Sequence, residues 1–361
     1  MNNNQIISKD DFRKLRDSEI NSENRYLSVW HPFDTIEDED VGSIRPWTRE
    51  GQKSHGFGHD FYSTLVWYKD WKIRRFEQSA WNLDDAIKNK ISKHFSILIS
   101  EALNEVDEGS IDIERSIDVK EYLKNYDTTF ISQYTAVDYL FQNITNRKIN
   151  NVVDFGSGIA RQSMQWDEDV NFYSIDAVES LYLLQNKIYS KLFPNRLKEY
   201  FADPSGFAKI DHSKNKNTLY HMPTWRMDLI PDNSIDLIIC VQVLNEIDEK
   251  TVRHVIGQFK RIAKKDCVLY VRDHEAHYSP GLKIRVGRVL LEHGFEVVFR
   301  YNGFSSDLEG VPRVWANTGY KSTLKKRVLR GISYPNTDGI FYFKPFFKSI
   351  LYKLRDIGLP I

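Results

Sequence analysis

The sequence predicts an α/β fold built around a buried parallel sheet. Two apolar runs are the main sign: residues 151–153 lead into Asp154 and a glycine turn, and residues 172–175 end in Asp176. Runs that stay apolar, instead of alternating with polar residues, are typical of strands that are covered on both faces. Stretches with helical spacing precede and follow these strands, so helices are expected to cover the sheet.

The chain before the sheet is predicted to be mostly helical. Apolar residues recur at steps of three and four from Ile87 to Leu103, and a second such stripe covers residues 131–141. Residues 1–30 are polar and charged, and they are expected to be loose or only lightly anchored.

The glycine turn after the first strand indicates a ligand at the carboxyl edge of the sheet. Gly156 and Gly158 allow a tight turn whose backbone presses against a ligand. Asp176 ends the next strand eighteen residues after Gly158, where an acid can accept hydrogen bonds from both hydroxyls of a ribose. The two features together predict a bound nucleoside.

Two residues argue against a dinucleotide. Arg161 stands where a dinucleotide-binding turn needs a third glycine, and Asp154, two residues before Gly156, would repel a pyrophosphate. An acid at that place suits a ligand with a positive charge, such as the amino or sulfonium group of S-adenosylmethionine (SAM). The pattern Asp154-x-Gly156-x-Gly158 therefore resembles the first motif of class I SAM-dependent methyltransferases.

Later segments extend this resemblance in the order that the family has. A Pro-Asp turn leads into an apolar strand over residues 228–247, residues 267–273 resemble the fifth strand, and residues 293–298 resemble the step into the sixth. The third and seventh strands are expected at residues 218–222 and 311–315. The resemblance implies a Rossmann-like, seven-stranded methyltransferase sheet with an antiparallel seventh strand, an N-terminal helical region and a short C-terminal extension.

The expected organisation has three parts. Residues 1–145 form a helical region that recognises the acceptor and covers the site, residues 146–319 bind SAM, and residues 320–361 form an extension rich in basic and aromatic residues. Within the SAM-binding part, a helix is predicted over residues 178–193, and residues 195–217 are expected to form an irregular polar insertion.

The resemblance places the donor at the edges of the first, second and fourth strands, with one further residue before the sheet. The expected donor-binding residues are Asp154, Phe155, Gly156, Ser157, Gly158, Asp176, Ala177, Met227, Asp228, Val241, Gln242 and Tyr134. Many relatives carry an acid for the adenine amino group, but Trp225-Arg226-Met227 stands in that place here. Trp225 and Met227 are candidates for covering the adenine ring, although core packing explains Trp225 equally well.

Methyl transfer to a hydroxyl needs a base, because the protein must align donor and acceptor and take up one proton. His274 directly follows the fifth strand and is the predicted base, with Asp273 or Glu275 orienting it. A solvated polar turn is the competing interpretation. No metal ligand is assigned: Mg²⁺ held by this loop and His277 is the less favoured alternative, because four neighbours on one loop rarely converge on an ion.

The acceptor is expected to be a sugar hydroxyl of a glycan or a nucleotide-linked glycoside. Trp and Tyr residues are frequent before the sheet and suit sugar rings, although a helical core uses them equally. The long helical front and the Gln-Tyr … Asp-Tyr-Leu-Phe approach at residues 133–141 resemble bacterial sugar O-methyltransferases of polysaccharide gene clusters. The alternatives are N- or O-methylation of another small molecule, and a catalytically silent methyltransferase fold that binds a partner.

Composition favours a cytoplasmic enzyme. The 361 residues are 41% hydrophobic, enough for a sizeable core, and Lys+Arg and Asp+Glu are both 50, which argues against a nucleic-acid partner. No secretion signal or transmembrane run is seen, and Cys240 and Cys267 are expected to be reduced, buried thiols in neighbouring strands. The basic extension is predicted either to pack on the core or to contact an anionic partner, such as a membrane or a phosphorylated glycan carrier.

Overall fold

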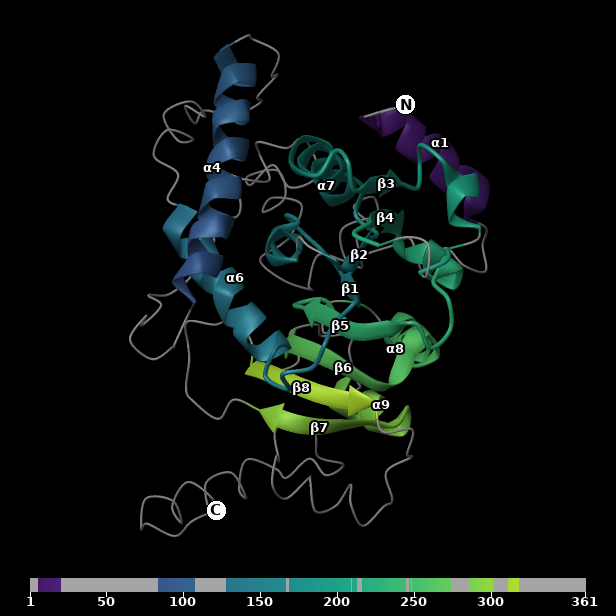
Figure 1. Cartoon of the computed structure of the whole chain (residues 1–361). Coiled ribbons are helices and arrows are strands. Elements are labelled where there is room, and N and C mark those ends of the chain that lie inside the picture. The colour runs from purple at the N-terminus through teal and green to yellow at the C-terminus, as the bar shows by residue number, and fades with distance from the viewer. Residues whose placement is uncertain are drawn as a thin grey trace, which may run out of the picture.

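A computed structural model of the chain describes residues 6–20, 84–107, 128–166, 169–208, 210–212, 216–244, 247, 249–273, 286–300 and 311–317. In this part of the chain, helices lie on both faces of a single sheet (Figure 1).

An eight-stranded sheet forms the centre of the described structure. Its strands are β1 (Asn151–Phe155), β2 (Asn171–Asp176), β3 (Leu197–Glu199), β4 (Leu219–Pro223), β5 (Ile235–Val241), β6 (Ala263–Asp273), β7 (Phe295–Arg300) and β8 (Val311–Asn317). They lie in the order β3-β4-β2-β1-β5-β6-β8-β7, and β8 runs antiparallel to both of its neighbours while the other pairs are parallel. The predicted Rossmann-like sheet with an antiparallel last strand is confirmed, and β3 is added at its edge.

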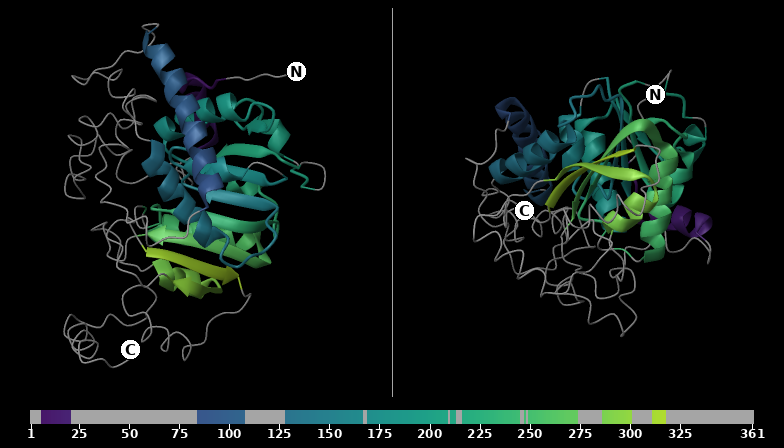
Figure 2. Two further views of the ribbon diagram at one scale, coloured as in Figure 1. Left: turned by 60° about the vertical axis from the view of Figure 1, so that its left-hand side comes forward. Right: turned by 90° about the horizontal axis from the view of Figure 1, so that it is seen from below.

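Helices cover the two faces of this sheet. They are α1 (Lys9–Glu19), α4 (Asp85–Asp107), α6 (Thr128–Gln142), α7 (Glu179–Leu192), α8 (Glu249–Ile262) and α9 (Val286–Glu292), with the short 3-10 helices η4 (Arg161–Gln165), η5 (Pro204–Phe207) and η6 (Thr224–Leu229). Val153 packs in the core with α8 and α9, and its neighbour Val152 packs in the core with α4, α6 and α7. Figures 1 and 2 show α4 and α6 across the sheet from α8 and α9. Successive side chains of a buried strand point to opposite faces of the sheet, so each strand contributes to the core on both faces.

The helices predicted from apolar spacing are confirmed as α4, α6 and α7. Ile91, Phe95 and Leu98 from the first of these stripes are buried. The predicted strands are also present, although β6 begins at Ala263, earlier than its apolar run indicated.

The expectation of an irregular insertion over residues 195–217 is wrong in part. Leu197–Glu199 form β3, which pairs in parallel with β4, and Pro204–Phe207 form η5. The strand is three residues long, and its sequence Leu-Lys-Glu contains no β-branched or aromatic residue. No local pattern marked it, because its pairing with β4 alone makes it a strand.

The expectation of a loose N-terminal stretch is wrong for residues 6–20. There, α1 begins with a capping box. The backbone N–H of Asp11 donates to Ser8 Oγ at 3.1 Å, and the backbone N–H of Ser8 donates to Asp11 Oδ2 at 3.3 Å. These two bonds satisfy backbone donors that the first turn of a helix leaves free.

Aromatic packing anchors α1 to the rest of the molecule. Phe12 is fully buried, and the rings around it are those of Tyr182, Phe201 and Trp225. At the other end of the helix, Trp225 Nε1 donates to Glu19 Oε2 at 2.9 Å. Two apolar residues, Phe12 and Leu15, in a charged helix are too weak a signal to predict this docking from sequence.

The cysteine prediction is confirmed. Cys240 and Cys267 are free and buried in the neighbouring strands β5 and β6, and burial raises the pKa of both thiols. Among the helices of the described ranges, none has the length and hydropathy that a membrane span requires.

Candidate functional site

The turn after β1 is shaped by two glycines in the left-handed region, with φ of +74° at Gly156 and +54° at Gly158. A Cβ added to Gly156 would lie 2.2 Å from Cγ2 of Val243, so a side chain does not fit there. The backbone N–H of Gly156 donates to the carbonyl of Ile175 at 2.8 Å, and Ser157 Oγ donates to the carbonyl of Asp154 at 2.9 Å. The first bond holds the turn against the end of β2, and the second closes the turn on the end of β1.

Asp176 ends β2 and joins this turn to the start of α7. Its Oδ2 accepts hydrogen bonds from the backbone N–H of Gly158 at 3.1 Å and from Gln185 Nε2 at 2.8 Å. Its Oδ1 accepts from the backbone N–H groups of Ala177 and Val178 at 2.8 and 3.0 Å. Burial raises the pKa of Asp176 despite these donors. Ribose binding by Asp176 stays a prediction, and ribose hydroxyls would have to share its oxygens with these donors.

Asp154, at the carboxyl end of β1, is buried without full compensation. Asp154 is 1% exposed, and its Oδ2 has no hydrogen-bond partner within the described part of the chain. Burial raises the pKa of Asp154 to about 7, although the charge of Arg161 acts in the opposite direction. A cationic ligand next to this carboxyl would supply the missing charge, so the residue fits the amino or sulfonium group for which it was predicted.

Asp273 is a second buried acid at the same edge of the sheet. It ends β6, and its Oδ1 accepts a hydrogen bond from the backbone N–H of Val243 at 3.2 Å. Its Oδ2 is another buried oxygen for which the described residues offer no hydrogen-bond partner. Burial raises the pKa of Asp273 to about 6, against the charge of Arg313. Val243, which also contacts the Gly156 position, thus links the two acidic ends of β1 and β6.

Arg161, which replaces the third glycine of a dinucleotide turn, has a structural partner. Its Nη1 donates to Oδ2 of Asp138 on α6 at 2.6 Å, and Arg272 Nε on β6 donates to Oδ1 of the same carboxylate at 2.8 Å. Gln162 Nε2 adds a bond at 2.9 Å. Burial alone would raise the pKa of Asp138, but the charges of Arg272 and Arg161 lower it below its ordinary value.

This buried cluster was missed by sequence reasoning. The sequence places Asp138 only in the helical stripe and the Asp-Tyr-Leu-Phe stretch before the sheet, and marks Arg161 only as a departure from the dinucleotide pattern. The cluster ties α6 and η4 to β6 directly behind the glycine turn.

The adenine side is less open than the sequence suggested. Trp225 packs against α1 and bonds to Glu19, as described above. The Met227 side chain is buried in the main core, and its carbonyl accepts hydrogen bonds from the backbone N–H of Ile230 and from Arg261 Nη2. Asp228 is exposed and pairs with Arg226 at 3.2 Å. Adenine contacts by Met227 and Asp228 stay predictions.

Other predicted residues divide between the sheet edge and segments outside the described residues. Phe155, Ala177, Val241 and Gln242 lie at the carboxyl ends of β1, β2 and β5 or directly after them. Tyr134 is in α6, but its side chain is not among those described. His274, Glu275 and His277 lie outside the described residues, so of the predicted catalytic group only Asp273 is placed.

The order of the strands decides the fold. β1 has β2 on one side and β5 on the other. The strands that follow β1 are therefore added first on one side of it and later on the other, which makes the end of β1 a topological switch point. Ligands of open α/β sheets bind at such a point. The fold is Rossmann-like, with an antiparallel β8 between β6 and β7. Asp154, the glycine turn and Asp176 all lie at this switch point.

No protein-family model matches the chain, and no curated protein has a matching sequence. Among solved structures, the N-methyltransferase NodS from Bradyrhizobium japonicum in complex with S-adenosylhomocysteine is similar to it at 12% identity and a TM-score of 0.36, over 56% of this chain and 93% of that one.

Magnesium protoporphyrin IX methyltransferase from Synechocystis with bound SAM is similar at 15% identity and a TM-score of 0.33, over 65% of this chain and 96% of that one. A SAM-dependent methyltransferase from Aquifex aeolicus is similar at 19% identity and a TM-score of 0.32, over 53% of this chain and 98% of that one. At these scores the fold assignment rests on the strand order.

Proposed function

We propose that the chain is a SAM-dependent methyltransferase that acts on a sugar hydroxyl of a glycan or a nucleotide-linked glycoside. The observation that carries the donor assignment is the buried carboxyl of Asp154. Its Oδ2 has no hydrogen-bond partner among the described residues, and it precedes a turn in which a side chain at Gly156 does not fit. A cationic nucleoside matches this combination better than a dinucleotide, whose pyrophosphate an acid would repel.

Residues of this chain have separate tasks in the proposed reaction. When bound, SAM supplies a methyl group already activated on a sulfonium. Gly156 and Gly158 let the backbone approach the donor, Asp154 attracts its amino group, and Asp176 receives its ribose hydroxyls. Alignment of the acceptor with the methyl group is the main contribution that the protein makes to the rate.

The acceptor half rests on the sequence. The Trp and Tyr residues before the sheet suit sugar rings, and the approach to β1 resembles that of bacterial sugar O-methyltransferases. A sugar hydroxyl needs a base to accept its proton, and His274, beside Asp273 at the end of β6, takes that role in the proposal. An amine acceptor would need less help from a base, and so an N-methyltransferase is the second candidate.

Titration calorimetry with S-adenosylhomocysteine (SAH) and with NAD⁺ tests the donor. We expect the protein to bind SAH and not NAD⁺. Asp154→Asn and Asp176→Asn should each weaken SAH binding, by about 1.5–3 kcal/mol for each hydrogen bond to a charged group that is lost. Asp169→Asn, a change at an exposed acid, is the matched control and should leave the affinity unchanged. Equal binding of NAD⁺ would contradict the proposal.

Donor-dependent methylation tests the acceptor. Purified protein, isotopically labelled SAM and either extracted glycans or nucleotide sugars should give a labelled sugar. Label that appears in amines and not in sugars would favour the second candidate.

A further inference from the structure

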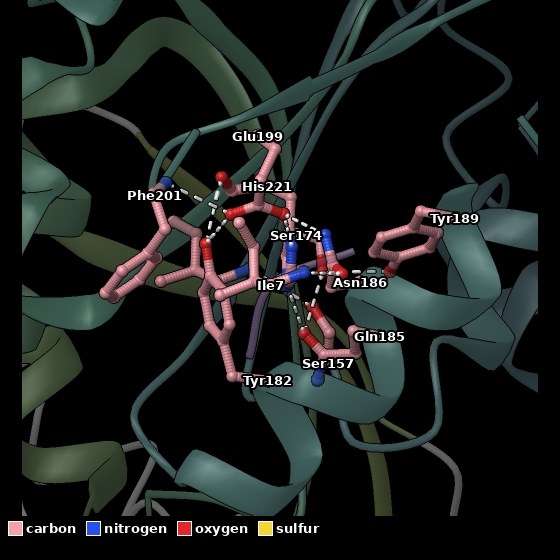
Figure 3. Close-up of polar contacts among 11 residues, drawn as sticks. Ile7, Ser157, Ser174, Tyr182, Gln185, Asn186, Tyr189, Glu199, Phe201 and His221 are labelled. Carbon is pink, nitrogen blue, oxygen red and sulfur yellow. Dashed lines mark hydrogen bonds and ion pairs between the residues drawn. The ribbon is translucent and has the colours of Figure 1, made fainter. Parts of the chain in front are cut away.

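A chain of buried polar side chains connects strands β3 and β4 and helix α7 to the glycine turn (Figure 3). His221 Nδ1 lies 2.6 Å from Glu199 Oε2, and His221 Nε2 lies 3.0 Å from Gln185 Oε1. Gln185 Nε2 then donates to Asp176 Oδ2 and to the carbonyl of Gly158, both at 2.8 Å. Glu199, His221 and Gln185 are all more than nine-tenths buried. The chain therefore ends on two residues of the proposed donor site.

The surroundings of Gln185 fix the orientation of its amide. The carboxylate of Asp176 and the carbonyl of Gly158 only accept hydrogen bonds, so the amide nitrogen faces them. The amide oxygen consequently faces His221, and because that oxygen only accepts, His221 Nε2 carries a proton. Ser174 Oγ donates to the same amide oxygen at 3.3 Å.

Glu199 on the other side of His221 is surrounded by donors. Tyr182 OH donates to its Oε1 at 2.6 Å, as does the backbone N–H of Phe201 at 3.2 Å, and Asn186 Nδ2 donates to its Oε2 at 2.9 Å. Burial raises the pKa of Tyr182, so its phenol keeps its proton. These three donors use both oxygens of Glu199 as acceptors, and His221 Nδ1 adds a fourth hydrogen bond to Oε2.

His221 is thus held at both ring nitrogens, by Glu199 on one side and Gln185 on the other. The ring of Tyr182 stacks on the imidazole with centroids 3.8 Å apart and an interplanar angle of 19°. Hydrogen bonding and stacking together fix the position of the imidazole ring.

We infer that His221 is a positioning residue for donor binding, which acts by holding the Gln185 amide in the single orientation that bridges Asp176 and Gly158. The inference rests on the proposed function. Asp176 and Gly158 set which end of the amide faces them, and the bond from His221 holds the other end in place. Without the Nε2 proton of His221, the amide oxygen keeps only the bond from Ser174 Oγ at 3.3 Å, so Gln185 is less firmly held against Asp176 and Gly158. The bond from Gln185 to Asp176 would then weaken, and with it the link between the glycine turn and β2.

Calorimetry with SAH on His221→Phe and Asn171→Ala tests this. Asn171 is buried on the same strand as Asp176 but at its other end, where it bonds to Asn151 at 2.9 Å, so its change controls for lost stability. We expect His221→Phe to weaken SAH binding about tenfold or more, the factor that corresponds to one hydrogen bond to a charged group. Asn171→Ala should bind SAH within about twofold of the original chain while it unfolds more easily. Equal affinities of the two variants would overturn the inference.

Nuclear magnetic resonance of the unaltered protein gives a second test that does not depend on a variant folding. With ¹⁵N-labelled histidine, the ring that contacts Tyr182 should show a proton on Nε2, and its signals should shift when SAH is added. An Nε2 without a proton, or signals that ignore bound SAH, would refute the inference. If the unaltered protein does not bind SAH at all, the proposed function itself fails, which is a different result.

Discussion

Asp154 and Asp138 are both buried carboxyls near the glycine turn, and their surroundings move their pKa values in opposite directions. Burial dominates at Asp154 because one of its oxygens lacks a partner among the described residues. At Asp138, two arginines outweigh burial. An unpaired buried acid is a candidate for binding a cation, whereas a paired one holds structure together.

The pKa of Asp154, about 7 in the folded protein and 3.8 ordinarily, predicts a pH-dependent stability. The fold favours the protonated form, so this contribution is full below the ordinary pKa and is lost as pH rises through about 7. Asp154→Asn removes the ionisation, and should raise the free energy of unfolding of the unbound protein at pH 8 by a few kcal/mol, on the order of 1.4 kcal/mol per unit of pKa shift. Urea denaturation at pH 5 and pH 8 measures it. A gain of equal size at both pH values would contradict this explanation. Asp169→Asn is the control and should not change the free energy of unfolding at either pH.

His274 carries the predicted proton transfer. For a sugar hydroxyl acceptor, His274→Ala should lower kcat by about 10²–10⁴-fold and leave SAH affinity nearly unchanged, because a general base acts in the transition state. Steady-state rates with the identified acceptor measure this, and His254→Ala on α8 is the control. Turnover at the original rate would transfer the role to another group, such as Glu275, or indicate an amine acceptor.

Among the elements, α6 is held to the sheet by charge as well as by packing. Asp138 on α6 receives Arg161 from η4 and Arg272 from β6, and the side chains of Asp138 and Arg272 are fully buried. The cluster places the helix that leads into β1 in a fixed relation to the glycine turn.

Asp138→Ala should destabilise the protein by about 3–5 kcal/mol, because it removes the carboxylate that pairs with the buried charge of Arg272. Urea denaturation at pH 7 measures the loss. Arg253→Ala on α8 also removes two ion pairs, but its partners Glu249 and Glu292 are partly exposed, so it should cost only about 0–1 kcal/mol. Similar losses in both variants would show that burial does not set the strength of the cluster.

The anchoring of α1 gives another element-scale prediction. Phe12→Ala should cost about 3–5 kcal/mol, since it removes a fully buried ring from contact with Tyr182, Phe201 and Trp225. Ile6→Ala changes an apolar residue that is 56% exposed just before the helix, and should stay within about 0.5 kcal/mol. Thermal or urea unfolding compares the two. Equal small losses would mean that the helix is not part of the cooperative fold.

At the scale of the whole molecule, the central strands and the glycine turn could be predicted from the sequence, because burial on both faces and glycine geometry each leave a local pattern. The central strands are continuous apolar runs, and the turn at Gly156 and Gly158 needs residues without side chains. Pairs that meet only in the folded chain were not predictable. Asp138 and Arg272 are 134 positions apart, and neither has a neighbour that marks its partner. β3 could not be predicted either, because its pairing with β4, and no pattern in its own three residues, makes it a strand.

Donor binding should stabilise the whole chain through linkage. At a free SAH concentration of one hundred times its Kd, the free energy of unfolding should rise by about 2.7 kcal/mol if SAH binds only the folded state. Urea denaturation with and without SAH measures the gain. NAD⁺ at the same concentration should give none, and Asp154→Asn should lose most of the gain that SAH gives. Stabilisation by both nucleotides alike would point to a site that does not distinguish them.

The docking of α1 has a consequence for the synthesis of the protein on the ribosome. Glu19 and Trp225, which bond to each other, are separated by 206 positions. At a synthesis rate of roughly 5–20 residues per second, α1 waits roughly ten to forty seconds before its receiving surface exists. For most of that interval Phe12 has none of its aromatic partners, because Tyr182 and Phe201 are also made late. The nascent chain therefore offers an apolar residue to chaperones, or to neighbouring chains, that the finished molecule hides completely.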